Sequence, residues 1–414
     1  MITACELGAT PCAGPGGPHR RPEHDMIRPR RIIERWGLDP ESLPGENEAR
    51  HASWLELFFD LVFVLALAAV QNRLTDAVPD VDEILRTAGL FVIVWWAWVG
   101  QAFYDTRFDP DDLRHRLAVL VGMIGAGIMA VGAKDAPDTL LLPIGYLVVR
   151  GTLLALYLRV RGIGATAREL TTVYLIGFSV GLSFWVASLA VPAQNRALLW
   201  LIGLIVELLT PWLGRRWLIK HPVHPAHLPE RIGQFTIILL GVSLTDLIGA
   251  VPTRPSPAVV VVAITGFLIP ASVWWVYTTF VTMGLTTSRL SAGLGYATVH
   301  GAIGSTLLLL GWCLGQAVRE VSTGREDLPE MLRLLMAVSL ASWMVGGLAL
   351  QWIALGTVPP LRIGIAAVAI ALVGAVALVP PPLALMPLLA LLMIGYAVVV
   401  SRLIVRFAGN RIET

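Results

Sequence analysis

Charged residues are scarce in this chain, and their scarcity excludes an ordinary soluble domain. Of the 414 residues, only 14% are Asp, Glu, Lys or Arg, whereas 56% are hydrophobic. A soluble globular domain carries about 25% charged residues. The composition is instead typical of an all-α, polytopic transmembrane helix bundle, for which the lipid bilayer is the main partner.

Several chemical signatures are also missing. The cysteines Cys5, Cys12 and Cys313 are too far apart for a metal knuckle, and we expect no metal site and no resident cofactor. The net charge is only +2, and no basic face lies outside the loops and the N-terminal tail, which argues against a nucleic-acid partner. No G-x-x-x-x-G-K motif is present, so we do not expect nucleotide hydrolysis to drive the protein.

Residues 1–50 lack the continuous apolar core of a signal peptide and are rich in Pro, Gly and Arg. We expect them to form a disordered cytoplasmic tail.

The remaining chain contains twelve apolar runs with the length needed to cross a bilayer. They lie near residues 53–74, 84–104, 114–133, 138–160, 170–191, 196–219, 229–250, 258–283, 292–318, 329–355, 362–379 and 383–407.

The orientation follows from the distribution of basic residues, because cytoplasmic loops carry an excess of Lys and Arg. Most of the Lys and Arg residues fall on one side if the N-terminus is inside the cell. We therefore predict a protein of the bacterial cytoplasmic (inner) membrane with both termini in the cytoplasm.

The seventh run resembles the first. Glu56 aligns with Glu230 and Asp60 with Gln234 at a constant offset, and a similar offset aligns Trp95-Trp96 with Trp274-Trp275. This pattern predicts two parallel six-span halves, residues 51–228 and 229–414. Chance recurrence of Trp and Leu in apolar helices is the alternative.

Two carboxylates lie inside the first run. Glu56 and Asp60 fall on one stripe of the predicted helix, and an acidic residue at the centre of a spanning helix costs about 2.5 to 3.5 kcal/mol. We therefore interpret Glu56, Asp60 and their counterparts Glu230 and Gln234 as candidates for proton or substrate binding. The alternative is that the carboxylates cap helix N-termini.

Two opposite charges lie nearest the middle of the membrane. Arg150 and Glu207 each need a partner to remain ionised, so we expect them to pair with each other. The pair would serve either structure alone or substrate and proton binding.

The loop after the second run is acidic. Asp109, Asp111 and Asp112 could bind Mg²⁺ for a diphosphate substrate, and their D-x-D-D order resembles the acid motif of a class of terpene cyclases. The alternative is that they cap the third helix.

Aromatic residues cluster toward the predicted cytoplasmic side. Trp95 and Trp96, with Trp274, Trp275 and Tyr277, either line a pocket for an apolar or cationic guest or form an interfacial belt.

His300 is a titratable group near the same side, and an ordinary helix–helix hydrogen bond is its alternative role. The G-x-x-x-G motifs that begin at Gly177 and Gly311 predict close helix packing, within the chain or in a homo-oligomer.

Three motifs resemble the bacterial low-temperature-requirement A family. They are Glu56-Leu57-Phe58-Phe59-Asp60, the Trp95-Trp96-Ala97-Trp98 run with the acidic loop that follows it, and His227-Leu228-Pro229-Glu230-Arg231-Ile232-Gly233-Gln234-Phe235. The resemblance implies a multi-pass membrane protein. This chain has Val242 where the family pattern has a glutamate between Leu-Gly and Ser.

The leading hypothesis is a proton-coupled secondary transporter of a small or anionic solute. The second is an intramembrane enzyme that acts on a lipid or isoprenoid diphosphate through Asp109, Asp111 and Asp112, with Mg²⁺ as a possible cofactor. The third is a stress-tolerance scaffold without turnover.

Overall fold

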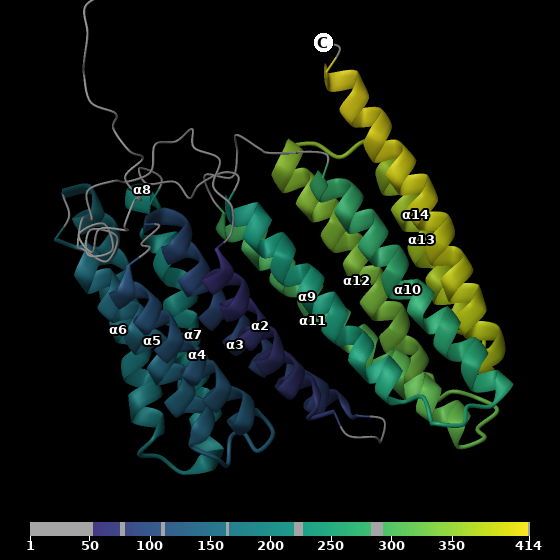
Figure 1. Ribbon diagram of the computed structural model, residues 1–414, viewed down its shortest axis with the longest axis horizontal. Coiled ribbons are helices and arrows are strands. Elements are labelled where there is room, and N and C mark those ends of the chain that lie inside the picture. Colours follow the sequence, from purple (N-terminus) through teal and green to yellow (C-terminus); the bar gives the residue numbers. More distant parts are fainter. Residues whose placement is uncertain are drawn as a thin grey trace, which may run out of the picture. The chain divides into compact units, whose positions relative to one another are not determined.

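The computed structural model describes residues 53–74, 79–108, 112–162, 165–218, 227–282 and 293–412, and within these ranges every regular element is a helix (Figure 1). The expected all-helical fold is therefore confirmed. The tail expected at residues 1–50 lies outside the described residues.

The helices have the following bounds: α2 (Trp54–Gln71), α3 (Val81–Phe108), α4 (Leu113–Ala133), α5 (Leu141–Val160), α6 (Ala165–Ser188), α7 (Ala193–Leu213), α8 (Arg215–Leu218), α9 (His227–Gly249), α10 (Pro257–Thr282), α11 (Leu294–Ser322), α12 (Glu330–Leu355), α13 (Pro360–Val376) and α14 (Pro382–Ile412).

Among the described residues, eleven helices are long and apolar enough to cross a membrane, one fewer than expected. The difference is α13, an apolar helix of 17 residues. At a rise of 1.5 Å per residue it is about 25 Å long, which is shorter than a hydrocarbon core of about 30 Å. Two of the prolines that interrupt the apolar pattern begin helices: Pro360 is the first residue of α13 and Pro382 the first of α14.

Helices α2 and α9 run in parallel. Arg231 of α9 donates to Glu56 of α2, and Gln71 of α2 donates to Asp246 of α9; both pairs are 175 residues apart in the sequence. Equal separations near both ends of the contact require two helices that point the same way. Two tandem six-span halves would produce this arrangement, and the division of the chain into halves stays a prediction.

Glycines bring helices close together at both predicted G-x-x-x-G motifs. A Cβ on Gly181 of α6 would collide with Glu207 of α7, and one on Gly311 of α11 would collide with Ser243 of α9. The close packing that the motifs predict is therefore confirmed, and it occurs within the chain.

Four helices form the centre in which the candidate site lies. Helices α2, α3, α9 and α11 each contact the other three. Their facing side chains belong to one cluster of buried hydrophobic residues, which includes Phe63, Trp95, Phe235 and Leu307. Polar side chains buried among these four helices are therefore shielded from both lipid and water.

Candidate functional site

The candidate site is built around a guanidinium group that meets three carboxylates. Arg231 of α9 has no exposed surface. Its Nη1 atom lies 3.0 Å from Oε1 of Glu56 and 2.7 Å from Oδ2 of Asp105, and its Nη2 atom lies 3.4 Å from Oδ1 of Asp60. We call these four residues the Arg231 cluster. Helices α2, α3 and α9 each contribute to it.

Two buried histidines flank the Arg231 cluster. Nε2 of His227 lies 3.4 Å from Oε2 of Glu56, and Nε2 of His115, from α4, lies 2.9 Å from Oδ1 of Asp105. Two of the three carboxylates of the cluster therefore have a buried imidazole beside them.

The two oxygens of Asp60 have different surroundings. Oδ1 accepts a hydrogen bond from Nε1 of Trp98 at 2.6 Å and lies near Arg231. Oδ2 is buried and has no hydrogen-bond partner among the described residues. A proton can therefore be added at Oδ2 without breaking any of the bonds that hold Asp60.

Local sequence explains how α2 presents its carboxylates. Ser53 precedes the helix as N-cap, its Oγ accepts from the backbone N–H of Glu56, and Oε2 of Glu56 accepts in return from the backbone N–H of Ser53. This capping box satisfies two of the free N–H groups at the helix start. The cap role expected as an alternative for Glu56 is confirmed, and the same carboxylate also contacts Arg231.

Helix α3 presents a matching polar face. Trp98, Gln101 and Asp105 lie within about 60° of arc at 100° per residue. Trp98 donates to Asp60, while Nε2 of Gln101 donates to Oδ1 of Asp105 at 2.7 Å. The ring of Trp98 also packs on Phe235, with centroids 4.2 Å apart. Polar contacts and aromatic packing thus fix this face of α3 against α2 and α9.

The predicted pairing of Arg150 and Glu207 is present. Nε of Arg150, in α5, lies 2.8 Å from Oε2 of Glu207, in α7, and neither side chain is exposed. The same oxygen accepts from the hydroxyl of Tyr146 at 2.6 Å and from Nε1 of Trp96 at 3.2 Å. One carboxylate oxygen therefore holds three helices together.

Glu230 and Gln234 do not hold the place that the repeat gave them. It is Arg231 that reaches Glu56 and Asp60, while Nε2 of Gln234 donates to Oε1 of Glu230 at 3.3 Å, one turn away on α9. Both side chains are half-buried. Neighbouring helix positions are about 100° apart, so a shift of one residue changes which side chain faces α2.

The two tryptophan pairs lie in different surroundings. Trp95 and Trp96 are buried, whereas Trp274 and Trp275 are 43% and 57% exposed. The exposure of Trp274 and Trp275 fits the interfacial belt, and the burial of Trp95 and Trp96 is compatible with a pocket, so each of the two alternatives stays a prediction. The outer pair lies on the surface of α10, where a membrane protein meets lipid.

Tyr277 and His300 form a pair of their own. The hydroxyl of Tyr277, in α10, lies 3.2 Å from Nε2 of His300, in α11, and Nδ1 of His300 lies 2.9 Å from the backbone oxygen of Tyr296. The helix–helix hydrogen bond expected as one role of His300 is therefore present.

Asp112 caps α4, and Asp109 and Asp111 lie outside the described residues. Oδ1 of Asp112 accepts from the backbone N–H of His115 at 2.9 Å, and its carboxylate is paired with Arg159. Burial alone would raise the pKa of Asp112, but the bonds from Arg159 and from the His115 backbone outweigh it and hold this pKa below its ordinary value. The cap interpretation is confirmed for Asp112.

Sequence reasoning missed several members of the site. Asp105 and His115 lie in or beside the charged loop, in which only Asp109, Asp111 and Asp112 were named as candidates. Arg231 and His227 lie in the nine-residue motif of the family resemblance, from which only Glu230 and Gln234 were named as candidates. The available signal was their spacing, because His227 and Arg231 are four residues apart, about one turn of helix. No group of His, Cys, Asp or Glu among the described residues is arranged to hold a metal ion.

Comparison with known proteins gives one family. The family described as bacterial low temperature requirement A protein (LtrA) matches residues 51–398. An uncharacterized protein of Rhizobium meliloti (strain 1021) is 28% identical over 243 residues, a match that covers 55% of this chain and 58% of that relative. The chain thus spans little more than half of the relative's length. No solved structure matches the chain.

Proposed function

The chain belongs to the bacterial low temperature requirement A family, and we propose that it is a proton-coupled secondary transporter of a small anionic solute. The chain is a multi-pass membrane protein, with eleven helices suited to span a bilayer. The observation that carries the proposal is the Arg231 cluster, in which one buried guanidinium meets three buried carboxylates.

The first supporting argument is the balance of charge. The cluster has two more carboxylates than guanidinium groups, and an uncompensated charge inside the membrane is expensive. Two protons on the three carboxylates would bring the cluster to neutrality. Moving a proton into or out of the cluster therefore changes its charge by one unit in a medium of low dielectric constant, where the change has a large effect on neighbouring groups.

The second argument is the place of the cluster in the fold. Its carboxylates lie on α2 and α3 and its guanidinium on α9, so the network joins three central helices. Protonation of Asp60 would weaken its attraction to Arg231 and hence the contact between α2 and α9. A change of this kind between helices is what alternating access requires.

The contacts of Asp112 favour transport over the enzymatic alternative. A catalytic acid or a metal ligand needs a carboxylate oxygen that can turn to a substrate or ion. Asp112 instead uses its carboxylate to cap α4 and to pair with Arg159.

The test is solute-dependent proton flux in liposomes that contain the full-length protein and a pH-sensitive dye. A panel of anionic solutes is added under an imposed pH gradient. We expect at least one solute to drive proton movement by the wild-type protein, and Asp60→Asn to reduce that movement to the level of empty liposomes.

The matched control is Asp82→Asn. Asp82 is exposed near the start of α3 and pairs with Arg86 one turn away. The variant therefore removes a carboxylate from one of the helices of the site without touching the Arg231 cluster. It should keep wild-type flux. Equal flux in Asp60→Asn and Asp82→Asn, or no flux with any solute of the panel, would contradict the proposal.

A further inference from the structure

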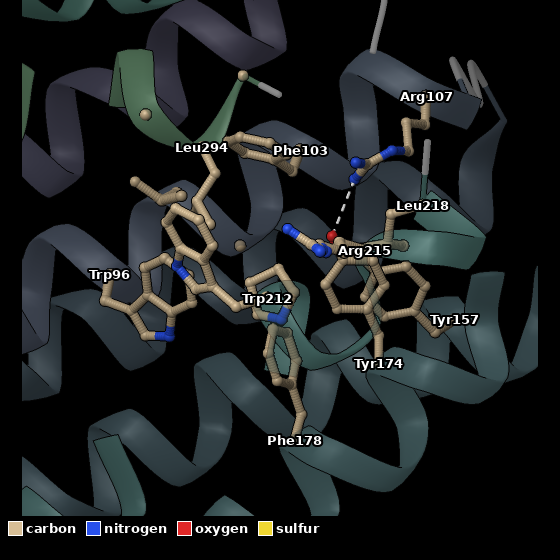
Figure 2. Close-up of a pocket in the computed structure, with 15 residues that line it drawn as sticks. Trp96, Phe103, Arg107, Tyr157, Tyr174, Phe178, Trp212, Arg215, Leu218 and Leu294 are labelled. Carbon is tan, nitrogen blue, oxygen red and sulfur yellow. Dashed lines mark hydrogen bonds between the residues drawn. The ribbon is translucent and has the colours of Figure 1, made fainter. Parts of the chain in front are cut away.

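A pocket of about 300 Å³ borders α3 at Trp96, Phe103 and Arg107 (Figure 2). This volume is at the lower end of the roughly 300 to 1,000 Å³ typical of small-molecule sites. Aromatic rings form its walls: Trp96, Phe103, Tyr157, Tyr174, Phe178 and Trp212. Such walls favour an apolar chain or ring as occupant.

The charged side chains of the pocket are all positive. Its lining includes Arg107 and Arg215 and no acidic residue. Nη1 of Arg107 donates to the hydroxyl of Tyr174 at 3.2 Å, which points its guanidinium over the pocket (Figure 2). Arg215 makes no ion pair with any described residue. Two guanidinium groups beside one apolar cavity fit a molecule with an anionic head, because one guanidinium can donate two parallel N–H···O hydrogen bonds to a phosphate group.

A third guanidinium, that of Arg150, lies next to the pocket. Gly100 lines the pocket, and a Cβ on Gly100 would collide with Nη1 of Arg150. This Nη1 is fully buried and has no hydrogen-bond partner among the described residues. Glycine at position 100 thus leaves a buried, unpartnered donor next to the cavity.

Helix α3 connects the pocket to the Arg231 cluster. Trp96, Gly100, Phe103 and Arg107 lie within about 60° of arc, and this face is roughly opposite to the face of Trp98 and Asp105. Asp105 and Arg107 are only two residues apart, so a shift or rotation of α3 moves both sites together.

We propose that this pocket binds a single-chain amphiphile with a phosphate head, with the chain among the aromatic rings and the head between Arg107 and Arg215. The inference deepens the proposed function, because it names the class of solute. It rests on that function in one respect only, which is that the bound amphiphile is the transported molecule. The binding site itself is tested without any transport measurement.

The experiment measures equilibrium binding of radiolabelled dodecyl phosphate to the full-length protein in non-ionic detergent. We expect saturable binding by the wild-type protein and binding about ten-fold weaker in Arg215→Gln, the effect of losing one charge-assisted contact. Arg216→Gln is the matched control, because Arg216 is the next residue, is exposed, and stacks on Trp217 outside the pocket. It should bind as the wild type does.

Two competitors define the ligand. Dodecyltrimethylammonium has the same chain and the opposite charge, and inorganic phosphate has the head without the chain; both should compete poorly. Equal binding by Arg215→Gln and Arg216→Gln would overturn the assignment, as would equal competition by the cationic amphiphile. Equal competition by inorganic phosphate alone would overturn the role of the aromatic walls.

A folded variant is confirmed by an unchanged size-exclusion profile. Binding without proton flux in liposomes would refute the transporter and leave the pocket assignment intact. Proton flux without binding of dodecyl phosphate would refute the pocket assignment alone.

Discussion

Neutralising one member of the buried pair Arg150–Glu207 should destabilise the protein much more than neutralising both. The pair is fully buried, with 2.8 Å between Nε of Arg150 and Oε2 of Glu207. Either single change, Arg150→Met or Glu207→Gln, leaves the other charge uncompensated in the interior. Breaking a buried pair in this way costs about 3 to 5 kcal/mol of unfolding free energy.

The double variant keeps most of the remaining contacts. The amide oxygen of Gln at position 207 can still accept from Tyr146 and Trp96, which both donate to Oε2 in the wild type. Methionine fills much of the volume of the arginine stem. We therefore expect the double variant to lose only about 1 to 2 kcal/mol, because replacing a buried pair by groups of similar volume is often close to neutral.

The assay is a double-mutant cycle on the unfolding free energy, measured by SDS titration in mixed micelles and followed by the fluorescence of the 14 tryptophans. A cycle on the exposed pair Asp82–Arg86 is the control and should give a coupling energy near zero. If the effects of Arg150→Met and Glu207→Gln add to within about 0.5 kcal/mol, the reasoning is refuted. Exchanging the two charges would be a poorer test, because the guanidinium of Arg150 occupies the space that the missing Cβ of Gly100 leaves open, and a glutamate there would not fill it.

Two further variants test packing and pH dependence. Asp112→Ala should lower the apparent Tm at pH 7, since a lost N-cap costs about 1 kcal/mol and the pair with Arg159 is lost as well. The pKa of Asp112 is lowered in the folded state. Its contribution to the unfolding free energy is therefore fully present above the ordinary aspartate pKa of about 3.9 and is lost as the pH falls through the folded value. A Tm difference between the wild type and Asp112→Ala that does not shrink below about pH 4 would contradict this. Gly125→Ala should destabilise α4 against α5 by about 1 to 3 kcal/mol, because its Cβ would collide with the backbone oxygen of Gly145. Gly127→Ala, two residues along, meets no atom and should not lower the Tm in the same thermal assay, since alanine is the better helix former.

Much of the helical architecture was predictable from the sequence. The apolar runs, together with the prolines at positions 360 and 382, place most helices to within a few residues. At α13 the run is apolar as predicted, and its helix of 17 residues is at the lower limit of the lengths that cross a bilayer. The capping roles of Glu56 and Asp112 were also predictable, because a cap depends on residues three positions apart.

The composition of the candidate site was only partly predictable. Arg150 and Glu207 were correctly paired, since each is an isolated charge deep in an apolar run and each needs a partner. The aromatic pairs were not distinguished, because Trp95-Trp96 and Trp274-Trp275 look alike in sequence and differ only in which way their helices face.

The sequence by itself determined that this chain is a helical membrane protein, because the length and hydropathy of each segment are local properties that decide whether that segment can span a bilayer. Only the tertiary structure decided which charges meet. Glu56 and Arg231 are 175 residues apart, and whether they touch depends on which helices are neighbours and how each is rotated about its axis. A rotation of about 100° would present Glu230 in place of Arg231, and side-chain packing across several helices selects between the two.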